Sequence, residues 1–233
     1  MSERVRGAIA LAPAPEASSL ALDLSAGNGL SSRMLAERGW RVVSTEYKTR
    51  NRGWVAANLD SDLPFRSDTF DLVVMLEVIE HLSDIPHMLG EIARVMRPGA
   101  VAIVTTPNRL NVSSRIHHLL SGYYKGRRAP LPYKYRVEDG RNWHVMGLND
   151  LHWIAWGAGL RMDAIGRARR KMRAWVLAPI FWPFIAGFSW MLYGRTKDPA
   201  QRKINRELLG FMTSASLLMD ENIIMRFRKT EER

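Results

Sequence analysis

Apolar runs of strand length alternate with segments of helical periodicity up to about residue 106. Each strand predicted in this region is followed by a turn or a helix, which is the order that a parallel, doubly wound sheet requires. The predicted strands are Leu20–Leu24, Arg41–Glu46, Phe70–Leu76 and Val101–Thr105, which are counted as the first, second, fourth and fifth of the sheet. The predicted helices are Ser31–Arg38 and a helix that begins after Asp84 and ends at Pro98-Gly99.

The second half of the chain continues this pattern with longer interruptions. A short helix is expected over Arg115–Leu120, and a capped helix over Asn149–Gly159. A sixth strand is expected at Arg161–Gly166 and a seventh over Leu217–Lys229, which Asp220-Glu-Asn222 can break. The sequence therefore predicts a single α/β domain over residues 1–233, a seven-stranded, mostly parallel, doubly wound sheet, with residues 1–19 as a lead-in.

Glycine and small residues follow the first strand in the order Asp23-Leu-Ser25-Ala-Gly27-Asn-Gly29. Strand, glycine turn and helix together form the arrangement in which a nucleotide-type cofactor packs against the backbone at the carboxyl end of a strand. Glycine permits the tight turn and leaves no Cβ to obstruct a ligand. The second strand ends on Glu46, 23 residues after Asp23, where a carboxylate can accept hydrogen bonds from a ribose diol.

Three further segments follow these motifs: Asn58-Leu-Asp60 before Leu63-Pro64-Phe65, the segment around Glu77, and Pro107-Asn108 after the fifth strand. The order of all these motifs resembles that in the class I S-adenosylmethionine-dependent methyltransferases. The nearest branch is that of ubiquinone-type O-methyltransferases. The resemblance implies a Rossmann-like fold and S-adenosylmethionine as the cofactor. In this resemblance Ser25 stands in place of the family's first glycine, and Glu46 would bind the ribose. Asn58 or Asp60 would contact the adenine beside the backbone of Leu59, and Glu77 would lie near the methionine part. The implied cofactor-binding residues are Asp23, Ser25, Gly27, Gly29, Glu46, Asn58, Leu59, Asp60 and Glu77.

Carboxylate and imidazole groups near the fourth strand are candidates for the chemical step. Methyl transfer to oxygen or nitrogen requires alignment of the acceptor and removal of a proton, and Glu80, His81 and His144 are the candidate bases. Glu77-Val-Ile-Glu80-His81 also resembles the small-RNA 3′-terminal 2′-O-methyltransferases, in which two glutamates and two histidines hold a divalent metal. That resemblance implies Mg²⁺, Mn²⁺ or Zn²⁺ on Glu77, Glu80, His81 and His144; the alternative is that Glu80 and His81 are structural.

An insertion over residues 167–213 separates the last two strands, where this fold normally has a short hairpin. Residues 174–194 carry no charge over 21 positions, and arginines and lysines flank both ends. A single membrane crossing would separate two strands of one sheet, and Pro179 and Pro183 are expected to break a continuous helix. The sequence predicts a monotopic, in-plane helical element on an anionic cytosolic membrane face, with a hydrophobic dimer interface as the rival interpretation.

Composition narrows the partners and the compartment. The net charge of +11 favours an anionic partner, which is a membrane surface, an acidic substrate or nucleic acid. The absence of cysteine excludes disulfides, thiolate ligands and a cysteine nucleophile. Residues 108–145, with a basic, tyrosine-rich stretch, correspond to the acceptor-side lid of the family.

The sequence thus predicts an S-adenosylmethionine-dependent methyltransferase, cytoplasmic and peripheral at the inner face of the membrane. Its acceptor is expected to be a lipid-linked, glycan or amphipathic small molecule that is methylated on oxygen. Two alternatives stay open, a metal-dependent RNA 2′-O-methyltransferase and a cofactor-binding scaffold without turnover, and a homodimer is compatible with each.

Overall fold

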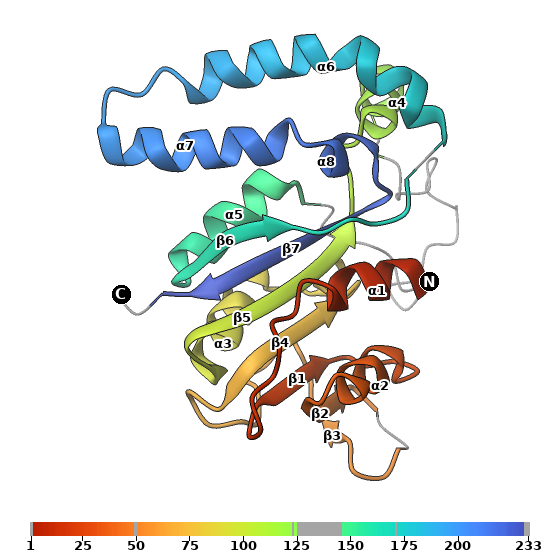
Figure 1. The fold of residues 1–233 in the computed structure, drawn as a ribbon, viewed down its shortest axis with the longest axis vertical. Helices are drawn as coiled ribbons and strands as arrows, with labels where there is room; N and C mark the ends of the chain where they lie inside the picture. The colour runs from red at the N-terminus through yellow and green to blue at the C-terminus, as the bar shows by residue number, and fades with distance from the viewer. Residues whose placement is uncertain (1, 49–50, 123, 125–145, 171, 231–233) are drawn as a thin grey trace.

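The structure is a computed structural model, and it describes residues 2–48, 51–122, 124, 146–170 and 172–230. Figure 1 shows one twisted sheet with helices on both faces and a pair of long helices beyond one edge of the sheet. The strands are β1 (Leu20–Leu24), β2 (Arg41–Glu46), β3 (Val55–Ala56), β4 (Phe70–Leu76), β5 (Met96–Pro107), β6 (Leu160–Ile165) and β7 (Asn222–Lys229). The helices are α1 (Ser2–Ile9), α2 (Leu30–Glu37), α3 (Ile85–Val95), α4 (Val112–Ser121), α5 (Leu148–Gly157), α6 (Met172–Tyr193), α7 (Pro199–Met212) and α8 (Ala215–Met219), with a 3-10 turn at Ile79–His81.

The strand order is β3-β2-β1-β4-β5-β7-β6. The pairs among β1 to β5 are parallel, whereas β7 runs antiparallel to both β5 and β6. The order reverses between β1 and β4, so a crevice opens beyond their carboxyl ends. The predicted seven-stranded, mostly parallel, doubly wound sheet is confirmed.

Two apolar layers hold the helices onto the sheet. One layer joins α3 and α5 to one face through Met88, Ile92 and Leu151, and the other joins α1 and α2 to the opposite face through Ile9 and Leu35. The buried strands are apolar on both sides because helices cover both faces. The carboxyl ends of these strands are therefore held at fixed positions, and residues that follow them can form a site at that edge of the sheet.

Two predicted boundaries were wrong, and the lead-in contains a helix that was not predicted. Residues Ser2–Ile9 of the lead-in form α1, whose apolar side packs on the sheet. The helix after Asp84 ends at Val95, and β5 begins at Met96, before Pro98-Gly99, because Phe70 of β4 already pairs with Met96. Leu217–Met219 belong to α8 rather than to the last strand.

The insertion consists of α6, α7 and α8, and α6 was predicted wrongly in one respect. It runs without interruption through Pro179 and Pro183. A proline removes one helical donor and crowds the preceding turn. The two prolines are four residues apart, so both gaps lie on the same face of the helix, and the other turns keep their hydrogen bonds. Helices α6 and α7 lie side by side and antiparallel, farthest from β3 in Figure 1.

Candidate cofactor crevice

The turn after β1 adopts the backbone that a closely approached ligand requires. Ser25, Gly27 and Gly29 all have positive φ, at 56°, 58° and 73°. A side chain placed on Gly27 would meet no atom of the protein nearer than 4.0 Å, so the space above this turn is open. Serine in a left-handed conformation costs on the order of 1 kcal/mol and is held only where the surroundings enforce it.

The side chains around Ser25 enforce that conformation. The Ser25 backbone N–H donates to Thr45 Oγ1 at 3.1 Å, and its hydroxyl donates to Glu46 Oε1 at 3.3 Å. Glu46 also accepts hydrogen bonds from the backbone N–H groups of Gly27 at 3.0 Å and Tyr47 at 3.2 Å. The carboxylate at the tip of β2 therefore fixes the turn at the tip of β1.

Asp23 lies beneath this turn and is 1% exposed. Its carboxylate accepts hydrogen bonds from the hydroxyls of Ser31 at 2.6 Å and Ser32 at 2.5 Å, in the first turn of α2. Burial raises its pKa, and these hydroxyls partly oppose that rise. Asp23 thus ties β1 to α2; its predicted contact with the cofactor stays a prediction.

A pocket of about 150 Å³ lies at the carboxyl ends of β1 and β2. Five residues predicted from the sequence line it, together with four that the sequence did not indicate. The predicted ones are Ser25, Glu46, Asn58, Leu59 and Asp60, and the others are Tyr47, Ala57, Val78 and Leu82. Tyr47 and Leu82 each lie one residue beyond a motif, and Val78 is an apolar residue within one, so only the fold shows that they line the same space.

Asn58 and Asp60, the two candidates for the adenine contact, are both exposed and line this pocket. Asp60 Oδ1 accepts a hydrogen bond from the backbone N–H of Ser83 at 2.7 Å, which joins the loop after β3 to the segment after β4. Asn58 Oδ1 accepts from the backbone N–H of Asp60 at 3.2 Å. Apolar Val78 and Leu82 with a polar rim of Asn58 and Asp60 suit a flat heteroaromatic ring that carries an amino group.

Glu77 lies apart from this pocket, at the end of β4, with a positive φ of 58°. Its carboxylate accepts from Thr105 Oγ1 at 3.0 Å and from Asn222 Nδ2 at 2.8 Å, and it pairs with Arg4 at 3.2 Å. Burial raises the pKa of Glu77, and the Arg4 guanidinium opposes that rise. Arg4 and Asn222 were missed from the sequence because α1 and the start of β7 are far from β4 along the chain.

Among the described residues, Glu80 and His81 are not grouped with Glu77 as ligands of one ion. Glu80 is buried in the 3-10 turn, whereas His81 is exposed, and His144 lies outside the described residues. Within the ranges described above, no three acidic or histidine side chains lie close enough to hold a metal ion. Glu77 already has three protein donors, so the described residues do not fit the predicted divalent site.

Glu80 has an unusual environment for a carboxyl group. It is 2% exposed, and its Oε2 has no hydrogen-bond partner among the described residues. Burial, and secondarily the neighbouring charge of Glu77, raises its pKa from 4.5 to about 7. A carboxyl whose pKa is higher in the folded than in the unfolded protein stabilises the fold while it is protonated. That contribution is complete below about pH 4.5 and is lost as the pH rises through about 7.

Replacing Glu80 with the neutral glutamine is therefore expected to stabilise the protein at alkaline pH. We expect Glu80→Gln to raise the free energy of unfolding by about 3 kcal/mol at pH 8.5 and to change it little at pH 4. Urea unfolding at the two pH values measures this. Glu91→Gln is the matched control with the opposite sign, because hydrogen bonding to Arg94 lowers the pKa of Glu91. A stabilisation that is independent of pH would contradict the ionisation of Glu80.

Comparisons with known proteins identify a methyltransferase domain in this chain. Residues 1–165 match the family model described as a methyltransferase domain. The chain is 33% identical to a probable S-adenosylmethionine-dependent methyltransferase of Mycolicibacterium smegmatis over 101 residues, which are 40% of this chain and 39% of that protein. It is 30% identical to a ubiquinone biosynthesis O-methyltransferase of Rhizobium etli over 101 residues, 38% of this chain and 41% of that protein.

A solved structure extends the likeness over the whole fold. The methyltransferase in complex with the Trm112 methyltransferase activator of Haloferax volcanii superposes with a TM-score of 0.59 at 17% identity, covering 98% of this chain and 90% of that one. The curated relatives are matched over only about two fifths of their length. From the matched family model, the sheet order and the residues around the crevice, the chain belongs to the class I S-adenosylmethionine-dependent methyltransferases.

Proposed function

We propose that this protein transfers a methyl group from S-adenosylmethionine to an acceptor hydroxyl of an amphipathic or lipid-linked molecule at a membrane surface. The single observation that carries the transfer activity is the pocket at the tips of β1 and β2. There, Glu46 and the backbone of the turn meet the predicted adenine-binding residues Asn58 and Asp60. S-adenosylmethionine would supply an electrophilic methyl group on a positively charged sulfur.

The residues around the crevice have separable tasks in this proposal. Glu46 would accept hydrogen bonds from the ribose diol, while its bonds to Ser25 and Gly27 hold the turn. Val78 and Leu82 would exclude water from the adenine. Glu77, fixed by Arg4 and Asn222, would place negative charge at the end of the crevice that receives the methionine part. Glu80, His81 and His144 stay the predicted bases for the acceptor hydroxyl.

The distribution of residues on α6 supports the membrane location. The helix buries small side chains, Ala174, Ala178 and Ser189. It exposes most of its large apolar ones, which are Met172, Trp175, Val176, Ile180, Phe181, Trp182, Phe184, Phe188, Trp190 and Leu192. A helix of a soluble domain has the reverse arrangement. Helix α6 has a mean hydropathy of 1.5 over its most apolar window, of which only 11% is buried, and it is long enough to cross a bilayer.

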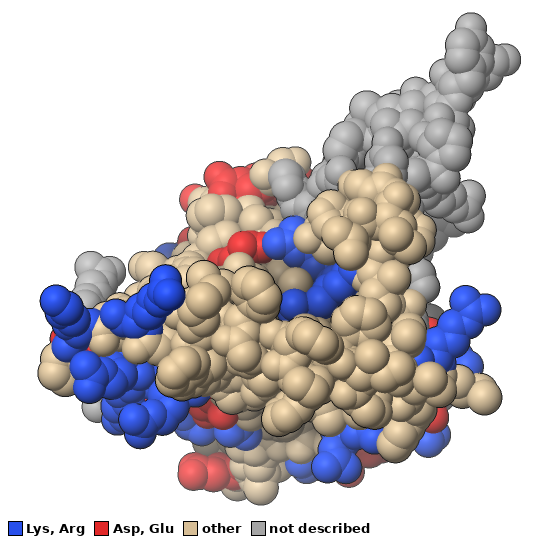
Figure 2. Space-filling model, turned by 90° about the horizontal axis from the view of Figure 1, so that it is seen from above, with Lys and Arg blue, Asp and Glu red and all other residues tan. Residues whose placement is uncertain are grey.

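The fold favours an in-plane orientation of α6 over a crossing. The insertion leaves the sheet at β6 and returns at β7, and these two strands pair with each other. Helix α7 runs back along α6 and exposes Arg202, Lys203 and Arg206. Viewed from the α6 side, uncharged surface lies between groups of Lys and Arg (Figure 2). An apolar strip bordered by cations suits the headgroup boundary of an anionic leaflet.

The experiment that tests the activity is methyl transfer from a radiolabelled donor to a membrane extract, followed by mass spectrometry of the labelled product. We expect label in the lipid-extractable fraction with the intact protein. Label should be reduced at least ~10-fold by His144→Ala if His144 removes the proton, since general bases contribute roughly 100-fold or more. Label confined to RNA or to a water-soluble acceptor would contradict the lipid-linked acceptor, and no label with bound cofactor would indicate a scaffold.

A further inference from the structure

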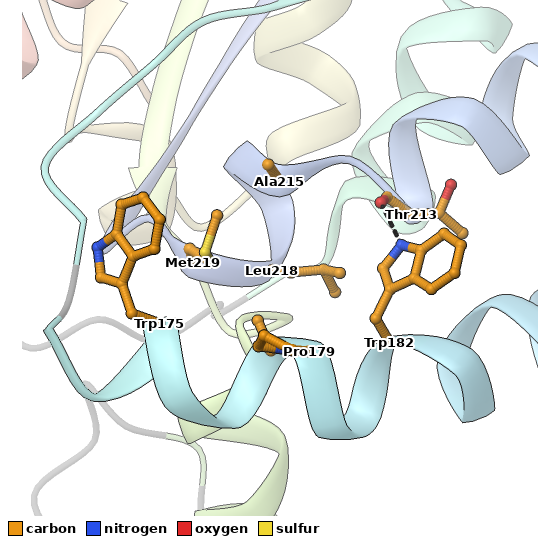
Figure 3. A pocket seen from close by; sticks show the side chains of 8 residues that line it. Trp175, Pro179, Trp182, Thr213, Ala215, Leu218 and Met219 are labelled. Atoms are coloured by element: carbon orange, nitrogen blue, oxygen red, sulfur yellow. Dashed lines mark hydrogen bonds between the residues drawn. The ribbon is translucent and has the colours of Figure 1, made fainter.

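An apolar groove opens between α6 and α8, on the side of α6 that faces the sheet. Its volume is about 370 Å³, and it is lined by Trp175, Ala178, Pro179, Trp182, Thr213, Ala215, Leu218 and Met219. Figure 3 shows Trp175 and Trp182 at the two ends of the groove, with Pro179 between them and Leu218 opposite. This volume lies within the roughly 300–1,000 Å³ of sites that bind small molecules.

The groove's lining offers little to a polar ligand. The indole N–H of Trp182 donates to the backbone carbonyl of Thr213 at 3.2 Å (Figure 3), and the Thr213 hydroxyl donates to the carbonyl of Leu209 at 2.9 Å. Both polar groups are therefore used within the protein. The remaining lining is aromatic and aliphatic, except for the indole N–H of Trp175, so the groove suits a hydrocarbon chain.

A basic pocket adjoins the groove at the start of α6. It is lined by Glu3, Arg6, Arg167, Ala168, Arg169 and Arg170, which are four arginines, one acidic residue and one alanine. Arg167 and Arg169 are exposed. Arginine presents a planar fork of donors that matches phosphate oxygens, and arginine clusters are the usual protein partners of phosphate groups.

Arg170 connects the two cavities. It lines the basic pocket, and its guanidinium lies 5.2 Å from the ring centre of Trp175, which lines the groove. Arg170 also pairs with the buried Asp220 at 3.6 Å, directly after Met219 of the groove. An anionic head in the basic pocket and an apolar tail in the groove would therefore lie on either side of the Arg170–Trp175 contact.

The basic pocket also lies beside the crevice. The backbone carbonyl of Arg169 accepts a hydrogen bond from the N–H of Glu221 at 2.9 Å, and the next residue, Asn222, donates to Glu77. Helix α1 contributes to both places, since Arg4 pairs with Glu77 while Glu3 and Arg6 line the basic pocket. A phosphate in this pocket would hold the attached group next to the end of β4.

We propose that the acceptor is a lipid phosphate, bound one molecule at a time, with its phosphate on Arg167, Arg169 and Arg170 and its hydrocarbon chain in the α6–α8 groove. This inference rests on the proposed function for the role of the molecule as acceptor, but the binding itself requires neither cofactor nor turnover. The arginines select the phosphate head group by charge complementarity, and the apolar groove selects the hydrocarbon chain. The rest of α6 remains available for the bilayer.

A brominated alkyl phosphate, used below its critical micelle concentration, tests the site in the intact protein. Bromine near the chain end quenches tryptophan fluorescence on contact. We expect saturable quenching with the wild-type protein, and its loss in Trp175→Phe/Trp182→Phe, which separates the groove from the other six of the eight tryptophans. A bromoalkyl trimethylammonium of the same chain length should quench weakly, because its head is repelled.

The arginines are tested by a matched pair of variants. Arg167→Gln/Arg169→Gln should weaken binding of the alkyl phosphate by at least ~10-fold, as expected for lost charge-assisted hydrogen bonds. Arg202→Gln/Arg206→Gln removes the same charge from α7 and should leave the affinity within about twofold, since these residues are outside both cavities. Calorimetry with S-adenosylmethionine shows separately whether the cofactor crevice is intact.

Three results would overturn the proposal. Equal quenching by the cationic and anionic amphiphiles would show that the arginines do not select the head. Quenching by vesicles that contain brominated lipid, without any by the monomeric phosphate, would show that the surface binds a bilayer and the groove holds no single chain. Undiminished binding in Arg167→Gln/Arg169→Gln would place the phosphate elsewhere. Each result is independent of whether methyl transfer is observed.

Discussion

Glu46→Ala is expected to raise the dissociation constant for S-adenosylmethionine about 100-fold, which corresponds to about 2.7 kcal/mol. The substitution removes the predicted acceptor for the ribose diol. It also removes the acceptor that holds the turn, because Glu46 binds the Ser25 hydroxyl and the backbone N–H groups of Gly27 and Tyr47. Without it, Ser25 has less reason to keep its positive φ, and the open space above Gly27 is no longer preformed. Isothermal titration calorimetry measures the effect.

The control for this prediction is Glu37→Ala, which removes an exposed carboxylate from the end of α2. It changes the net charge by the same amount and should leave cofactor affinity within about twofold, because surface charges away from a site contribute little. Thermal unfolding of both variants without cofactor separates weakened binding from global unfolding. Unchanged affinity in Glu46→Ala would remove Glu46 from the site.

A polar substitution of the outer stripe of α6 is expected to abolish association with anionic vesicles. Val176, Ile180, Phe184 and Phe188 recur every four residues and are 68%, 56%, 68% and 65% exposed. Full burial of such side chains contributes roughly 1.5–3 kcal/mol each. Even partial insertion of four therefore predicts a loss of at least ~100-fold in the partition coefficient when all four become serine. Vesicle sedimentation with an anionic lipid mixture measures the partition.

The matched variant changes the same four positions to leucine, which keeps the stripe apolar and the helix propensity high. Vesicle association should persist in this variant and should decline as salt is raised, because the cations of α7 and of the segment before α6 contribute electrostatically. A dimer that dissociates in the serine variant, with no vesicle association in the wild type, would instead assign this face to a second copy of the chain. Analytical ultracentrifugation distinguishes the two outcomes.

Much of the crevice could be predicted from the sequence because its residues are local to strand ends. Gly27, Gly29 and Glu46 belong to short motifs, and parallel strands bring their carboxyl ends to one edge. Asn58, Leu59 and Asp60 follow the same logic, and the structure places all three in the pocket with Ser25 and Glu46. By contrast, Arg4 and Asn222 reach Glu77 from opposite ends of the chain. No periodicity or spacing in the sequence relates positions that far apart.

The insertion also has features that the sequence predicts and features that depend on tertiary packing. The length of its uncharged segment and its basic flanks are sequence properties, and they indicated an interface with something anionic and apolar. The prolines predict helix breaks because propensity is a local property, whereas in the structure α6 continues through both of them. The apolar groove between α6 and α8 forms only because α8 packs against α6, and the sequence does not indicate that contact.

The sequence by itself determined the sheet, the nucleotide-type turn, the acid at the tip of β2 and the apolar character of residues 174–194, because each depends on neighbouring residues and on simple periodicity. Only the tertiary structure decided that Asp23 supports the turn from below, that Thr105, Asn222 and Arg4 hold Glu77, and that arginines before α6 adjoin an apolar groove. These features arise from contacts between segments far apart in the chain, and such contacts are set by packing rather than by local pattern.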